Sequence, residues 1–115
     1  DDSALARKTI CMALQKAGIT EIDEALDGAE AVQRAAVQEY QIILMDWNMP
    51  NMDGIVAVQK IRETNRITPI IMVTGLGDEY HVKEAISKGV NNFIVKPFKP
   101  DHAAAVIQET LAVKT

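Results

Sequence analysis

Residues 42–46, Ile-Ile-Leu-Met-Asp, constrain the fold of this chain more than any other stretch. Four apolar residues run directly into the carboxylate of Asp46, and a turn rich in Asn, Pro and Asp follows as far as Gly54. A continuous apolar run of this length predicts a strand buried on both faces, as in a parallel sheet with helices above and below it. A charged carboxylate is costly inside such a strand and natural where the strand emerges. Ligands of open α/β sheets bind at the carboxyl ends of the strands, so Asp46 is the first candidate for a functional residue.

The rest of the chain alternates between helical and strand-like patterns. Apolar residues at helical spacing predict helices within 5–17, 29–37, 55–61, 82–89 and 100–111. Strands are predicted at 19–26, 41–46, 70–74 and 93–95, the first of them half-exposed near an edge of the sheet. Gly18 and Gly89 are expected to end helices. Strict alternation of this kind predicts an α/β fold with a doubly wound parallel sheet.

Length, composition and charge limit the functions to consider. The 115 residues are enough for one domain, spanning 1–115. A net charge of −4 provides no basic surface for nucleic acid, and no apolar run approaches the roughly 20 residues that cross a bilayer. The single cysteine, Cys11, cannot form an internal disulfide, which is consistent with a reducing compartment. We therefore expect a cytoplasmic domain that binds neither nucleic acid nor membrane.

Three predicted strands end in chemically active side chains, Asp46, Thr74 and Lys96. Because parallel strands end at the same edge of a sheet, a carboxylate, a hydroxyl and an ammonium are expected to lie close together there. Aspartate can act as a nucleophile and form an acyl phosphate. The ammonium and the hydroxyl suit the oxygens of a transferred phosphoryl group.

Two further carboxylates, Asp1 and Asp2, immediately precede the first predicted helix. A loop between a strand and a helix at that point would lie on the same edge as Asp46. Three carboxylates gathered there would repel one another and attract a hard divalent cation. Mg²⁺ fits best, because it accepts a few oxygen ligands and retains several waters.

Four separated segments together resemble the receiver domain of two-component response regulators. They are residues 1–3, 45–54, 73–75 and 95–98, which read Asp-Asp-Ser, Met-Asp-Trp-Asn-Met-Pro-Asn-Met-Asp-Gly, Val-Thr-Gly and Val-Lys-Pro-Phe. The sequence around Asp46 is most similar to that of chemotaxis-type single-domain receivers. The resemblance covers the whole chain, and its motifs occur in the family's order.

The resemblance implies that Asp46 accepts a phosphoryl group from a phosphohistidine of a partner sensor histidine kinase or phosphotransfer protein. It implies that Asp1 and Asp2 bind Mg²⁺ together with Asp46, and that Asn48 supplies a backbone carbonyl to the metal. Lys96 matches the lysine that contacts the phosphoryl group. Such a domain catalyses its own phosphorylation and dephosphorylation and is not a turnover enzyme in the usual sense.

The resemblance also implies a conformational switch. Thr74 matches the hydroxyl that moves toward the phosphoryl group, and Phe93 matches the aromatic residue whose rotamer follows it. Many receivers have tyrosine at the position of Phe93, so a partner contact through a phenolic oxygen is not expected here. A downstream protein target would bind residues 80–102, and the domain is expected to be a monomer or a weak dimer.

One departure from the family concerns the central strand. Receivers have a flavodoxin-like sheet of order 2-1-3-4-5 whose first strand precedes the acidic pair, whereas here nothing precedes Asp1. Without that strand, two neighbouring strands would be unpaired and an apolar slot would open between them. We expect the sequence to be part of a longer protein with an apolar strand before Asp1. Supply of the strand by another chain is the less favoured alternative.

Two other functions remain open from the residues alone. A phosphatase of the haloacid-dehalogenase type also uses a nucleophilic aspartate at a strand end. It normally needs a second acid two residues later, where this chain has Asn48. An interaction module that is never phosphorylated could have the same fold, but it would have no need for Asp46, Thr74 and Lys96 together.

Overall fold

The computed structural model describes residues 4–19, 21–25, 27–46, 54–75, 79–96 and 98–113. Within these ranges the chain forms five helices and three strands. The helices are α1 (Ala4–Lys16), α2 (Gly28–Val37), α3 (Gly54–Arg62), α4 (Glu79–Ser87) and α5 (Pro100–Val113). The strands are β1 (Ile43–Asp46), β2 (Ile70–Thr74) and β3 (Asn92–Val95). Each overlaps a range that the sequence patterns predict, with ends that differ by a few residues.

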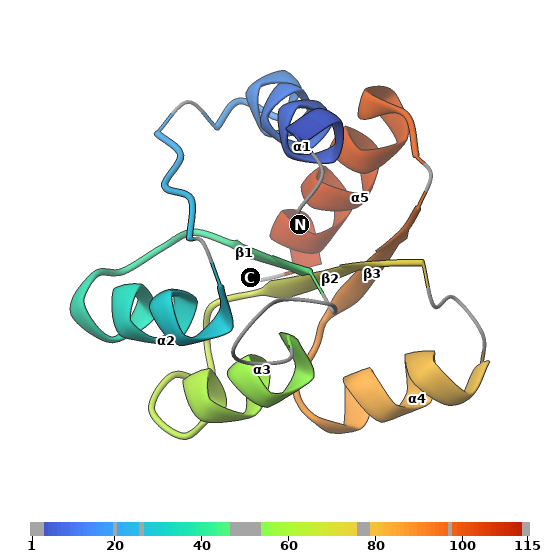
Figure 1. Ribbon diagram of the computed structural model, residues 1–115. Coiled ribbons are helices and arrows are strands. Elements are labelled where there is room, and N and C mark those ends of the chain that lie inside the picture. Colours follow the sequence, from blue (N-terminus) through green and yellow to red (C-terminus); the bar gives the residue numbers. More distant parts are fainter. Residues whose placement is uncertain are drawn as a thin grey trace.

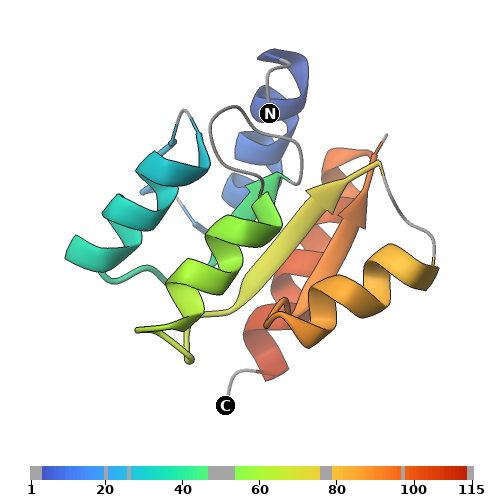
Figure 2. The ribbon, with the colours of Figure 1, turned by 60° about the horizontal axis from the view of Figure 1, so that its bottom comes forward.

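The three strands form one parallel sheet of order β1-β2-β3 (Figure 1). Asp46 is level with Val73 of β2, and Thr74 is level with Val95 of β3. All three strands therefore end at the same edge of the sheet, as Figure 2 shows for β2 and β3. The α/β fold with a parallel sheet is confirmed, while the order of any strands beyond these three stays a prediction.

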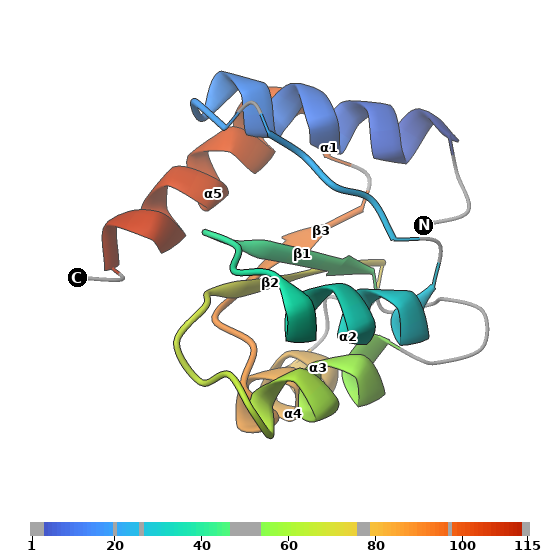
Figure 3. The same ribbon diagram turned by 90° about the vertical axis from the view of Figure 1, so that its left-hand side faces the viewer.

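Helices cover both faces of the sheet (Figure 3). On one face α1 and α5 pack over Ile71, Val73 and Ile94. On the other face α2, α3 and α4 pack over side chains that include Ile70 and Met72. Since alternate residues of a strand point to opposite faces, both faces of β2 are apolar and all five of its residues are buried. This explains why its sequence is a continuous apolar run.

Local signals set the ends of two helices. Gly18 follows α1 with a φ of 92°, in the left-handed region that glycine adopts without a steric penalty. Its amide donates to the carbonyl of Gln15 at 3.0 Å. Asp27 precedes α2, and its carboxylate Oδ1 accepts from the amide of Glu30 at 2.9 Å. Such an N-cap satisfies one of the amides that a helix start leaves without a partner in the helix.

The strand predicted at 19–26 is not present in the part of this range that the structure describes. Residues 21–25 form no regular secondary structure. A strand needs a neighbour for its backbone hydrogen bonds, and a cavity separates this segment from β1. The burial that the apolar pattern predicts is nevertheless observed, because Ile19 and Ile22 pack beside the cluster under α1 and α5. Helices long and apolar enough to span a bilayer are absent from the described ranges.

Candidate active site

Asp46 is the last residue of β1 and therefore lies at the edge of the sheet where the three strands end. It is only 8% exposed, and among the described residues it is the one acidic residue that is buried. Its carboxylate Oδ2 accepts a hydrogen bond from the ammonium Nζ of Lys96 at 2.9 Å. The two residues are 50 positions apart in the sequence, and the β2 strand lies between their strands. The fold therefore brings an acid and a base together across three strands.

The backbone holds this pair in place. The amide of Lys96 donates to the carbonyl oxygen of Thr74 at 2.8 Å, which extends the β2–β3 ladder one step past the end of β3. Lys96 is thus fixed at its backbone to the end of β2 and at its side chain to the end of β1. Because the backbone of the lysine is anchored, less conformational entropy is lost when its ammonium stays beside the carboxylate.

Burial makes the pair chemically significant. The side chains of Asp46 and Lys96 are 8% and 28% exposed, so their interaction is screened by water less than a surface ion pair would be. Removing one partner of a buried ion pair leaves an uncompensated charge and is strongly unfavourable. A carboxylate held beside a cation can act as a nucleophile while the cation offsets negative charge that develops on neighbouring oxygens.

Thr74 ends β2 at the same edge and is 1% exposed. Ile70 and Met72 of β2 belong to the cluster on the α2, α3 and α4 face, so the period of two places the Thr74 side chain on that face. Phe93 is level with Met72 and packs against the same cluster. The two side chains therefore share one face of the sheet on neighbouring strands.

The remaining predicted metal ligands, Asp1, Asp2 and Asn48, lie outside the described residues. Within the described ranges, no three His, Cys, Asp or Glu side chains gather as a metal site would require. The described contribution to such a site is the carboxylate of Asp46. A carboxylate oxygen at a sheet edge is the type of donor that Mg²⁺ prefers, so this residue fits the ion.

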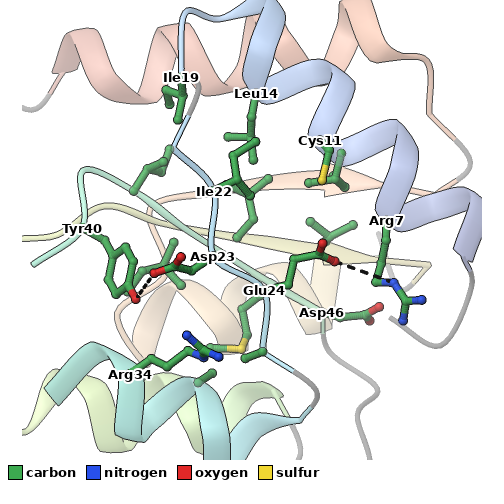
Figure 4. A pocket seen from close by; sticks show the side chains of 18 of the residues that line it. Arg7, Cys11, Leu14, Ile19, Ile22, Asp23, Glu24, Arg34, Tyr40 and Asp46 are labelled. Atoms are coloured by element: carbon green, nitrogen blue, oxygen red, sulfur yellow. Dashed lines mark hydrogen bonds and ion pairs between the residues drawn. The ribbon is translucent and has the colours of Figure 1, made fainter. Parts of the chain in front are cut away.

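Arg7 is a residue of this region that the sequence patterns do not predict. It lies on α1 and lines the same cavity as Asp46 (Figure 4). Its Nε is 3.8 Å from Oε1 of Glu24, and both side chains are about half exposed. Its position on the helix that follows the acidic pair is the only sequence signal that points to this neighbourhood. Arg7 and Asp46 line the same cavity because α1 packs over the sheet.

Comparison with known proteins identifies the family of this chain. The model of the response regulator receiver domain matches residues 1–108. The chain belongs to the response regulator receiver family. This receiver domain is 40% identical to chemotaxis protein CheY1 of Helicobacter pylori, over 98% of the chain and 90% of the relative.

Solved structures agree with this assignment. The chemotaxis protein CheY4 of Vibrio cholerae is 33% identical with a TM-score of 0.86, and the match covers 96% of this chain and 92% of that one. The receiver domain of sensor histidine kinase PA1611 of Pseudomonas aeruginosa is 29% identical with a TM-score of 0.85, covering 97% and 93%. That structure is described with a magnesium ion coordinated in its active site cleft. The resemblance to chemotaxis-type receivers is confirmed, and the domain is a two-component signalling module rather than a conventional enzyme.

Proposed function

We propose that Asp46 of this receiver domain accepts a phosphoryl group from a phosphohistidine of a partner kinase or phosphotransfer protein. The observation that supports this most directly is the 2.9 Å contact between Lys96 Nζ and Asp46 Oδ2 at the common edge of three parallel strands. Family membership supports it independently, since receivers act in two-component signalling.

The proposed reaction transfers a phosphoryl group from a histidine nitrogen of the partner to a carboxylate oxygen of Asp46. A carboxylate oxygen of Asp46 forms a bond to phosphorus while the bond from phosphorus to the histidine nitrogen breaks, and the electron pair of that bond stays on the imidazole. Lys96 offsets negative charge on the phosphoryl oxygens as the transfer proceeds. Attack of water on the acyl phosphate later returns Asp46 to its carboxylate and releases inorganic phosphate.

Mg²⁺ is the proposed cofactor. Asp1, Asp2, Asp46 and the backbone carbonyl of Asn48 would hold the ion. When bound, it supplies positive charge that offsets the phosphoryl oxygens and the clustered carboxylates. The magnesium described for the related PA1611 receiver domain supports the same type of site here.

The proposed consequence of phosphorylation is a change at residues 80–102. The phosphoryl group adds about −1.5 to −2 charges near neutral pH, which would draw the hydroxyl of Thr74 toward Asp46. Phe93 lies on the same face of the sheet as Thr74 and would move into the space that the threonine leaves. A downstream protein would then recognise the changed surface of α4, β3 and the start of α5. We propose that the domain acts as a monomer or a weak dimer, without direct contact to nucleic acid or membrane.

Labelling with acetyl phosphate tests the phospho-acceptor directly. We expect the wild-type domain to incorporate phosphate in the presence of Mg²⁺ and Asp46→Asn to incorporate none, because the amide cannot form an acyl phosphate by this route. Asp101→Asn is the matched control. Asp101 is an exposed aspartate of α5, and its carboxylate pairs with Lys16 at the end of α1. Equal labelling of Asp46→Asn and the wild type would refute the assignment.

Thr74→Val tests the switch separately from the chemistry. Valine preserves the size and branching of this buried side chain but removes its hydroxyl. We expect beryllofluoride with Mg²⁺ to shift the NMR signals of Phe93 in the wild type and to shift them several-fold less in the variant. Retained binding of beryllofluoride, read from the amide of Asp46, is the control. Identical Phe93 shifts in the two proteins would exclude Thr74 as the link.

A further inference from the structure

The contact between β3 and α5 contains a chain of hydrogen bonds beside its apolar contacts. α5 lies against β3 (Figure 2), and buried side chains of the helix, among them Ala103, Ala104 and Ile107, belong to the apolar cluster on this face of the sheet. Thr110, on the same helix, is only 7% exposed although it carries a hydroxyl. A buried hydroxyl needs hydrogen-bond partners, because leaving it without them costs free energy.

Three hydrogen bonds connect the backbone of β3 to the backbone of α5 through Thr110. The amide of Phe93 donates to Oδ1 of Asn92 at 2.8 Å. The side-chain amide Nδ2 of Asn92 donates to Oγ1 of Thr110 at 3.0 Å. This hydroxyl in turn donates to the carbonyl of Val106, four residues earlier in α5, at 2.8 Å. Asn92 uses its acceptor on one side and a donor on the other, so its side chain is held at both ends.

The chain of bonds crosses from one face of the sheet to the other. Phe93 packs against the cluster on the α2, α3 and α4 face. Successive residues of a strand point to opposite faces, so Asn92 points toward α5, as its bond to Thr110 requires. The amide of Phe93 joins the two faces, because its residue packs on one face and it binds a side chain on the other. A displacement of the Phe93 backbone therefore acts directly on Asn92.

Apolar contacts and hydrogen bonds respond differently to such a displacement. The contacts of Ala103 and Ile107 are non-directional, so they tolerate a small shift of the helix over the sheet. A hydrogen bond weakens steeply when its angle departs from the favoured geometry. The members of a bonded chain therefore move together or break a bond. A shift that apolar contacts would absorb is passed on where such a chain exists.

We propose that the hydrogen bond between Asn92 and Thr110, the α5 tether, couples the C-terminal half of α5 to the phosphorylation state of Asp46. The inference rests on the proposed switch, in which Phe93 moves when Thr74 is drawn toward the phosphoryl group. The Phe93 backbone shifts with its ring, Asn92 follows, and Thr110 moves α5 with it. The tether extends the response along α5, beyond the start of this helix that the downstream protein is proposed to recognise.

Beryllofluoride-induced NMR shifts test the tether in the 115-residue chain with Mg²⁺. In the wild type we expect shifts of the Phe93 signals and of the α5 amides 106–109. Thr110→Val keeps the size and branching of the side chain and removes the hydroxyl, so the Phe93 shifts should persist and the α5 shifts should become several-fold smaller. Thr110→Ser, which retains a hydroxyl, should restore them. Unchanged α5 shifts in Thr110→Val would overturn the tether.

A second variant and a matched control separate one coupled path from a general loosening of the helix. Asn92→Ala removes the other partner, and Gln108→Ala truncates an exposed side chain of α5. We expect Asn92→Ala to reduce the α5 shifts as much as Thr110→Val does, and the double variant to reduce them no further. Gln108→Ala should leave them as in the wild type. Reductions that add in the double variant, or an equal reduction in Gln108→Ala, would also overturn the tether.

The same spectra distinguish failure of the tether from failure of the proposed function. If beryllofluoride shifts Phe93 in the wild type but none of the α5 amides 106–109, the tether is wrong and the switch of Thr74 and Phe93 is still supported. If it shifts neither the amide of Asp46 nor the signals of Phe93, the proposed function fails and the tether fails with it.

Discussion

The two ends of the sheet both carry a cation among polar groups, but they use it differently. At the carboxyl edge, Lys96 meets the buried carboxylate of Asp46. At the opposite edge, Arg62 at the end of α3 donates to three uncharged acceptors. They are the carbonyl of Gly89 at 3.0 Å, the carbonyl of Asn65 at 3.0 Å and Oδ1 of Asn91 at 2.9 Å. The same side-chain oxygen of Asn91 also accepts from the amide of Ile70, the first residue of β2, at 2.8 Å.

The difference separates a structural cluster from a chemical one. Around Arg62 every acceptor belongs to a turn or a strand start, so the guanidinium joins the α3 end, the α4–β3 turn and β2. Burial lowers the pKa of Arg62, yet the group remains charged throughout the physiological range. At the other end, two opposite charges meet at an edge that a phosphoryl group could reach. Neutral partners hold the fold in place, whereas opposed charges at an open edge can respond to added charge.

Loss of the Lys96 ammonium should give the largest effect of this comparison. We expect Lys96→Met to lower the initial rate of labelling by acetyl phosphate by about 10²–10³-fold, because one preorganised charge at the reacting oxygens is removed. Lys16→Met removes an exposed cation from the end of α1 and should leave the rate unchanged. Rates are measured per folded molecule, as judged by circular dichroism. A Lys96→Met rate within threefold of the wild type would mean that the two ends of the sheet do not differ in this way.

Loss of the Arg62 guanidinium should act on stability and spare the chemistry. We expect Arg62→Met to lower the free energy of unfolding by about 2 kcal/mol, because three hydrogen bonds are lost, two of them partly buried. Arg66→Met, at an exposed position in the following turn, should change it by less than about 0.5 kcal/mol. Urea denaturation measures both, and the labelling rate per folded molecule should match the wild type. A reduced rate in folded Arg62→Met would show that this cluster also serves the active site.

The sequence predicts one of these two ends and misses the other for a physical reason. Asp46, Thr74 and Lys96 each follow an apolar run directly, so the rule that parallel strands end together is enough to group them. Arg62 and Asn91 lie 29 positions apart and are joined by the packing of a helix end against a turn. No periodicity or spacing marks an arginine as buried, or marks which carbonyls it will meet.

The strand predicted at 19–26 fails for a related reason. Periodicity reports which side chains are buried, and it is correct for Ile22, which packs against the core. It does not report whether a neighbouring backbone is present to complete the ladder. Residues 21–25 and β1 are separated by a cavity, so the described segment has the side-chain pattern of a strand without its pairing.

Two glycines with the same backbone requirement provide a test of how closely the cluster around Arg62 is packed. Gly18 and Gly89 both have positive φ, 92° and 112°, so alanine at either position should cost about 1 kcal/mol from backbone strain. A Cβ at Gly18 would meet nothing within 4 Å, whereas a Cβ at Gly89 would lie 2.8 Å from Cγ of Arg62. We therefore expect Gly89→Ala to be more destabilising than Gly18→Ala by about a further 1 kcal/mol in urea denaturation, since the Arg62 stem must move and its hydrogen bonds loosen.

The contact with Arg62 can be isolated by a double-mutant cycle. In the background of Arg62→Met, whose side chain can move aside without giving up hydrogen bonds, the excess cost of Gly89→Ala should shrink, while the cost of Gly18→Ala should stay the same. An excess at Gly89 that persists in this background would assign it to the α4–β3 turn itself. The Arg62 cluster would then be a consequence of the shape of that turn rather than a cause of it.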